Sequence, residues 1–98
     1  MKINTKLEKN SLTVTLEGRL DTNTSPNLEK ELGTLDEIEN LIFDFEKLDY
    51  ISSAGLRVLL SCQKNINSKS GLMIIKNVNE EIQEVFDMTG FSDILTIE

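Results

Sequence analysis

The sequence predicts an α/β fold, in which a mixed β-sheet starts with an N-terminal hairpin and continues with alternating strands and helices. Apolar and polar residues alternate in the two segments 2–8 and 11–17, and this period of two is typical of half-buried strands. Farther along the chain, short apolar runs alternate with segments that have leucines at helical spacing. Helices that cross between successive strands imply a sheet with a parallel centre and right-handed connections. We therefore expect the order β-β-α-β-α-β-α-β, with the helices on one face of the sheet or at its edge.

The first helix is expected shortly after the hairpin. Gly18-Arg19-Leu20-Asp21 closes the second strand, and Ser25 can cap a helix that has Pro26 at its first position. Three leucines then recur at i, i+4 and i+7, which gives this helix one apolar stripe to place on the sheet: Leu28, Leu32 and Leu35.

Two apolar runs later in the chain are expected to form inner strands of the sheet. Residues 41–45 are almost continuously apolar, which predicts a central strand covered on both faces. Residues 72–75 are expected to form a second buried strand after a turn. Between these runs, Ser52 and Ser53 precede leucines at helical spacing in residues 54–60, and this pattern predicts the second helix.

The C-terminal part of the chain predicts a third helix and a last edge strand. Asn79 is the expected cap of this helix, Gly90 ends it, and residues 94–97 are expected to add the edge strand. Seven apolar residues are expected in the core of the domain: Val14, Leu16, Ile42, Phe43, Leu59, Ile74 and Phe86.

Length and charge restrict the function. The 98 residues fit one domain, and 39% hydrophobic residues supply material for a core. Ten Lys and Arg against 17 Asp and Glu give a net charge of −7, which disfavours nucleic acid or an anionic membrane as a partner and favours a protein. No apolar stretch has the length of a signal peptide h-region or a spanning helix, so we expect a cytoplasmic protein.

The residue types argue against a catalytic centre. The chain has no histidine and a single cysteine, Cys62, so neither Ser-His catalysis nor a usual zinc site can be assembled. We expect no cofactor, no metal and no catalytic residue, with Cys62 as a buried apolar side chain. An enzyme using carboxylates as acid and base is the remaining catalytic alternative, but its candidates are scattered: Asp21, Asp44, Asp49, Glu80 and Glu81.

The segment 49–57 places small residues and two hydroxyl groups at a strand-to-helix junction. A helix start presents free backbone N–H groups and a positive dipole end, which would tolerate a phosphate on Ser53. A partner surface would respond differently, since a phosphate adds about −1.5 to −2 charge that a close contact must pair or repel. The alternative interpretation is that Ser53 is an ordinary helix cap.

Three motifs, taken together, resemble landmarks of the bacterial anti-sigma factor antagonists, whose fold is the STAS domain. Residues 50–57, Tyr-Ile-Ser-Ser-Ala-Gly-Leu-Arg, resemble the phosphorylation-site signature of that family. Residues 18–21 resemble its Gly-x-Leu-Asp motif, and residues 86–91, Phe-Asp-Met-Thr-Gly-Phe, resemble the end of its third helix. The resemblance covers essentially residues 1–98 as a single STAS domain.

This resemblance implies a partner-switching cycle. The unphosphorylated protein would bind an anti-sigma factor and free the sigma factor for transcription. The anti-sigma factor is usually also a serine kinase, which would phosphorylate the antagonist with ATP and release it, and a PP2C-type phosphatase would restore the binding form. The alternative function with the same fold is a small STAS subunit of a transport or stress-signalling complex in which the serine is never phosphorylated.

The resemblance also assigns the phosphate acceptor. The family acceptor commonly follows an Asp, and the matching position of this chain is Ser53. Ser52 stands where the family has that Asp, which removes a charge and adds a second candidate hydroxyl. Many family members also carry a further C-terminal helix after the last strand.

Partner contacts are expected around the acceptor, at Ser52, Ser53 and four further residues. Asp21 lies in a loop that the family places at the same end of the sheet. Ala54 keeps the helix start uncluttered, and Gly55 would allow another backbone to approach. Arg57, one turn into the helix, would face the partner or pair with the phosphate, or is an ordinary solvated residue.

Overall fold

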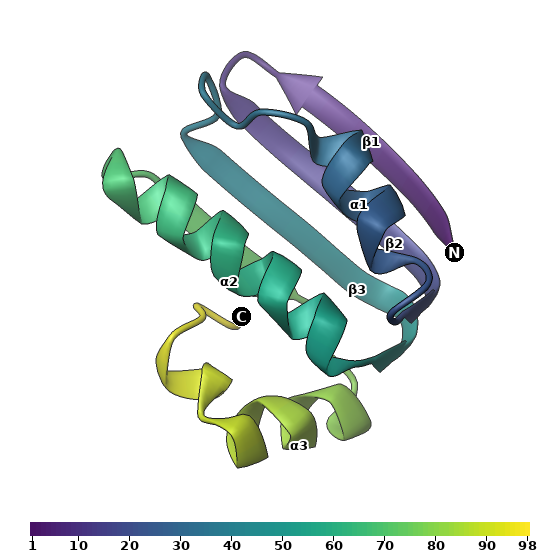
Figure 1. Ribbon diagram of the computed structural model, residues 1–98. Coiled ribbons are helices and arrows are strands. Elements are labelled where there is room, and N and C mark those ends of the chain that lie inside the picture. The colour runs from purple at the N-terminus through teal and green to yellow at the C-terminus, as the bar shows by residue number, and fades with distance from the viewer.

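A four-stranded sheet forms one layer of the computed structural model, which describes residues 1–98, and three α-helices pack on it (Figure 1). In sequence order the strands and helices are β1 (Lys2–Glu8), β2 (Ser11–Leu20), α1 (Ser25–Leu32), β3 (Asn40–Ile51), α2 (Ser53–Ser68), β4 (Leu72–Lys76) and α3 (Glu80–Thr89). A 3-10 helix, η1 (Phe91–Asp93), follows α3.

The strand order in the sheet is β1-β2-β3-β4, and the predicted mixed topology is confirmed. The hairpin strands β1 and β2 are antiparallel, whereas β2 with β3 and β3 with β4 are parallel. Strand β2 runs to Leu20, three residues beyond the expected end, because the β2–β3 register shifts twice and lets pairing continue. Gly18 lies in this irregular part with a φ of 107°, a backbone conformation that glycine adopts without strain.

Only one face of the inner strands is fully packed. Along β3, Leu41, Phe43 and Phe45 have no exposed surface, whereas Ile42 and Asp44 between them are half-buried. Both α1 and α2 lie in front of the sheet in Figure 1, with α2 between α1 and α3 in this view. The expectation that this strand is covered on both faces is therefore wrong, since its burial follows the period of two of a sheet with one packed face.

The expected core is confirmed at five positions and corrected at two. Side chains without exposed surface are Val14, Leu16, Phe43, Leu59 and Phe86. Ile42 and Ile74 are half-buried, because they are neighbours in the β3–β4 register on the face opposite to the helices. Leu72, at the start of the second run that was expected to be buried, is 49% exposed. A short apolar run does not by itself distinguish a strand packed on one face from one packed on two.

Helix α1 differs from the expectation at both ends. Ser25 lies inside the helix and is buried, and its hydroxyl donates to the Asp21 carbonyl oxygen at 2.6 Å instead of capping the helix. The cap position is Thr24, whose side chain makes no capping hydrogen bond. The helix ends at Leu32, so Leu35 lies in the following loop, although it is buried as its apolar spacing predicts.

The third helix is confirmed and the last strand is reduced to a single bridge. The Asn79 side chain accepts a hydrogen bond from the Ile82 N–H at 2.8 Å, which is the predicted cap. Gly90 ends the helix with a φ of 81°. Residues 94–97 do not form a strand, because after η1 only Ile97 pairs, in parallel, with Ile75 of β4.

Candidate functional site

The site forms where the parallel strands β2 and β3 end side by side. Leu20 and Ile51 are register partners at these ends, and the Ser52 N–H donates to the Leu20 carbonyl oxygen at 2.9 Å. Asp21 and Ser52 directly follow these two partners, so the loop after β2 and the start of α2 are neighbours. The two segments that sequence motifs singled out, residues 18–21 and 50–57, therefore meet at one end of the sheet.

Ser52, and not Ser53, caps helix α2. Its backbone is extended, with φ −100° and ψ 177°, and its hydroxyl oxygen accepts a hydrogen bond from the Gly55 N–H at 3.4 Å. Ser53 is the first residue of the helix and is exposed. The interpretation of Ser53 as a cap is thus corrected, and its hydroxyl stands at the positive end of the α2 dipole.

Gly55 is buried and faces the protein interior. A Cβ atom at this position would lie 2.8 Å from Ile51 Cγ1, 2.8 Å from Leu20 Cγ and 3.0 Å from the Leu20 carbonyl oxygen. The missing side chain therefore lets the first turn of α2 pack directly on the ends of β2 and β3. Another backbone does approach Gly55, as expected, and it is that of Leu20 in the same chain. Ala54 beside it is half-buried.

Asp21 organises the loop that follows β2. Its Oδ1 accepts hydrogen bonds from the N–H groups of Asn23 and Thr24 at 3.0 and 3.1 Å and from the Thr24 hydroxyl at 3.2 Å. Its Oδ2 lies 3.7 Å from Arg19 Nε. The pKa of Asp21 is lowered, first by the Thr24 N–H, with further contributions from Asn23, the Thr24 hydroxyl and Arg19. The carboxylate is therefore held as an anion within the site.

Two residues of the site were not singled out from the sequence. The Arg19 guanidinium carbon lies 4.1 Å from the centroid of the Tyr50 ring, a cation–π contact between register partners of β2 and β3. Tyr50 is 40% exposed, so this pair forms part of the surface. Both residues belong to the quoted motifs, but the register shifts that pair them leave no signal in the sequence. Arg57 is exposed and takes part in neither of the two ion pairs of the chain.

An acidic hollow lies near the site, at the start of α3. Asp49, Asn79, Glu80 and Glu81 line an open depression of about 570 Å³ where α3 begins. The Asn79 amide donates to the Leu48 carbonyl oxygen at 3.0 Å and so holds this helix start against β3. No group of three or more Cys, Asp or Glu side chains is arranged to hold a metal ion, and no helix is long and apolar enough to cross a membrane.

Comparisons with known proteins identify relatives by sequence and by fold. The family model described as STAS domain matches residues 2–98. The anti-sigma-B factor antagonist of Bacillus subtilis is 28% identical over 99% of this chain and 90% of its own. The anti-sigma F factor antagonist of Paenibacillus polymyxa is 29% identical over 99% and 86%. The solved structure of SpoIIAA from Bacillus in its unphosphorylated form has a TM-score of 0.80 at 18% identity, over 99% of this chain and 87% of that one.

Proposed function

This chain belongs to the STAS domain family, and we propose that it is an anti-sigma factor antagonist whose binding is switched off by a phosphate on Ser53. The observation that carries the proposal is the exposed Ser53 hydroxyl at the start of α2, beside the Asp21 loop and free of the capping role that Ser52 fills. The relatives named as antagonists of anti-sigma factors support the same partner class.

The position of the phosphate on Ser53 explains how the anti-sigma factor is bound and released. The unphosphorylated surface around Ser53, with Asp21, Ala54 and Arg57 at its border, binds the anti-sigma factor and thereby frees the sigma factor. An anti-sigma factor with serine kinase activity transfers the γ-phosphoryl group of ATP to Ser53 Oγ, releasing ADP and the hydroxyl proton. A PP2C-type phosphatase hydrolyses the phosphoserine and restores the binding form. This cycle takes place in the cytoplasm, where ATP and the transcription machinery are available.

Phosphorylation of Ser53 is expected to leave the fold unchanged. An anion at an exposed helix N-terminus is stabilised by about 0.3–1 kcal/mol, and Ser52 keeps the cap of α2 in either state. SpoIIAA has been solved in unphosphorylated and phosphorylated forms, and the two have TM-scores of 0.80 and 0.79 to this chain. In that protein, phosphorylation is therefore compatible with the same fold.

The phosphate is expected to oppose the interface. The Ser53 hydroxyl is neutral and exposed, so a partner that fits the unmodified surface needs no group to pair a phosphate there. A phosphate raises the local negative charge by about 1.5 to 2 units. A like charge, or an unpaired charge that loses its water, costs several kcal/mol at an interface. Phosphorylation should thus weaken binding by at least about a hundredfold.

The test combines acceptor mapping with binding. The anti-sigma factor recovered with this chain from its own cells is incubated with the purified protein and ATP, and intact mass and peptide mapping locate the phosphate. One phosphate is expected on Ser53, none in Ser53→Ala, and an unchanged level in the matched control Ser52→Ala. Titrations of phosphorylated and unmodified protein then measure the loss of affinity, and thermal unfolding should show an unchanged or slightly raised Tm.

Three results would contradict the proposal. Labelling that survives in Ser53→Ala but disappears in Ser52→Ala would move the acceptor to Ser52. A Tm that falls by many degrees on phosphorylation, with normal binding by the folded fraction, would mean that the switch acts through the fold. Recovery of transporter subunits, without any kinase, would favour the function as a STAS subunit of a larger complex.

A further inference from the structure

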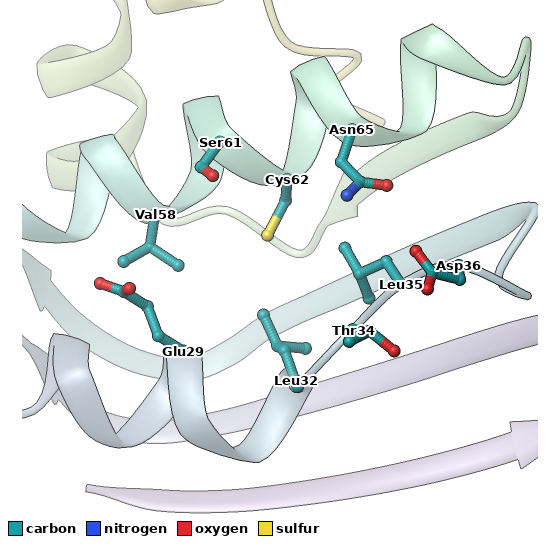
Figure 2. A pocket seen from close by; sticks show the side chains of 10 residues that line it. Glu29, Leu32, Thr34, Leu35, Asp36, Val58, Ser61, Cys62 and Asn65 are labelled. Carbon is teal, nitrogen blue, oxygen red and sulfur yellow. The ribbon is translucent and has the colours of Figure 1, made fainter.

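A groove separates α1 from α2 on the helical layer of the domain. Its volume is about 330 Å³, and Figure 2 shows side chains from both helices and from the loop after α1 pointing into it. The floor is apolar, because the Cys62 sulfur and the side chains of Leu32 and Leu35 face one another across the gap, with Val58 at one end. All four of these side chains are buried.

The charges of the groove lie at its two ends and have one sign. Glu29 projects from α1 toward the Val58 end, and Asp36 lies at the opposite end, near Asn65 (Figure 2). Neither carboxylate takes part in an ion pair of the chain, and no Lys or Arg lines the groove. One cation lies near the Asp36 end, where the Lys69 ammonium donates to the Leu35 carbonyl oxygen. The Cys62 thiol does not add charge, since burial and then Glu29 raise its pKa to about 11.

An apolar floor between two unpaired carboxylates is complementary to a side chain with an aliphatic stem and a cationic head. Arg and Lys bury their methylene stems on apolar surface while the charged group reaches polar partners. The net charge of −7 adds a long-range attraction for basic surfaces and opposes a second copy of this chain as the occupant.

The groove begins close to the proposed binding surface. Val58 follows Ser53 by five residues along α2, which is about 7.5 Å at 1.5 Å per residue. Val58 also lies about 140° around the helix from Ser53, at about 100° per residue, so a protein seated on Ser53 must reach around α2, past the side that carries Arg57, to enter the groove.

We infer that the α1–α2 groove is a second docking point of the anti-sigma factor and receives one Arg or Lys side chain of that partner between Glu29 and Asp36. This inference rests on the proposed function, because it names the same partner. It adds a contact that phosphorylation of Ser53 does not change. The groove contributes affinity and fixes how the partner is positioned on the domain, while the phosphorylation state of Ser53 determines binding or release.

The first experiment tests the groove without the partner. n-Butylguanidinium chloride is titrated into the ¹⁵N-labelled chain, with neutral n-butylurea as its matched control. The cation should shift the amide signals of Val58, Cys62 and Asn65 saturably, and at least about fivefold more tightly than the urea. The double variant Glu29→Gln/Asp36→Asn should remove this difference. No saturable shift at these amides, or equal binding of cation and urea, would overturn the inference.

The second experiment uses the anti-sigma factor recovered for the phosphorylation assay. Glu29→Gln/Asp36→Asn should weaken its binding about tenfold, whereas Glu31→Gln/Glu37→Gln, the same charge change outside the groove, should leave it within about twofold.

The results distinguish a failure of the groove inference from a failure of the proposed function. If the partner binds and loses binding on Ser53 phosphorylation, but the groove variant binds like the wild type, the inference is wrong and the proposed function stands. If no anti-sigma factor binds the wild-type protein, the proposed function fails and the identity of the groove's partner fails with it.

Discussion

Gly55→Ala is the sharpest test of how α2, which carries the proposed acceptor Ser53, is held on the sheet. The new methyl group would lie 2.8 Å from Ile51 Cγ1 and from Leu20 Cγ, and 3.0 Å from the Leu20 carbonyl oxygen. Ile51 and Leu20 are 3% and 0% exposed, and the contacted atoms lie near the backbone instead of at a flexible side-chain end. The first turn of α2 must therefore move outward.

The expected loss of stability is the difference between two effects. Overpacking a well-packed core by one methyl group costs about 1–3 kcal/mol. Alanine in place of glycine in a helix returns about 0.5–1 kcal/mol, and less in the first turn where Gly55 lies. The net free energy of unfolding should fall by about 1–2 kcal/mol, which lowers the Tm of a domain of this size by about 5–15 °C.

Thermal and urea unfolding of the purified proteins measure this loss. Lys64→Ala, an exposed substitution on the same helix, is the control and should stay within about 0.5 kcal/mol of the wild type. Binding of the anti-sigma factor by Gly55→Ala should also weaken, because the start of α2 that carries Ser53 is displaced. An unchanged Tm together with abolished binding would refute the packing argument and would instead assign Gly55 to the partner surface.

Two further predictions concern single side chains of α2. Ser52→Ala removes the cap and should lower the free energy of unfolding by about 0.5–2 kcal/mol, whereas Ser53→Ala should change it by less than about 0.5 kcal/mol; urea unfolding compares them, and equal losses would contradict the assignment of the cap. Burial and then Glu29 raise the pKa of Cys62 from 9.0 to about 11, so its stabilising contribution is complete below pH 9 and is lost as the pH rises to 11. The stability of the wild type relative to Cys62→Ala should fall by about 2–3 kcal/mol across this range, and a constant difference would contradict the burial of the thiol.

The sequence predicted those features of the fold that depend on local pattern. The hairpin follows from alternation in β1 and β2, and the end of α3 follows from Asn79 and Gly90, whose roles need only neighbouring residues. Local patterns also misplaced the caps of α1 and α2 by one residue each and predicted a strand over 94–97 that is only one bridge. The wrong burial assignments, in contrast, concern what lies across the sheet. Ile42 and Ile74 are as apolar as core residues, and only the β3–β4 register with α1 and α2 packed on the opposite face leaves them half-buried.

The resemblance to the family implied that Asp21 and the serines lie at the same end of the sheet, and the structure has Asp21 and Ser52 there. The internal arrangement of these residues could not be predicted. The contact between Arg19 and Tyr50 depends on two register shifts in the β2–β3 pairing. The residue types alone do not predict these shifts. The role of Gly55 likewise depends on the approach of Leu20, a residue 35 positions earlier in the chain.

In the proposed switch, two adjacent serines divide two tasks that would conflict in one residue. A capping hydroxyl accepts a backbone N–H, so a phosphate on it would change the helix start each time the protein is switched. Ser52 takes the capping role and is half-buried, and Ser53 remains exposed one residue later. Because the cap and the proposed acceptor are separate, phosphorylation of Ser53 would alter the charge of the surface while the first turn of α2 stays fixed on β2 and β3. A switch built in this way can change affinity by a large factor without drawing on the small net stability of the domain.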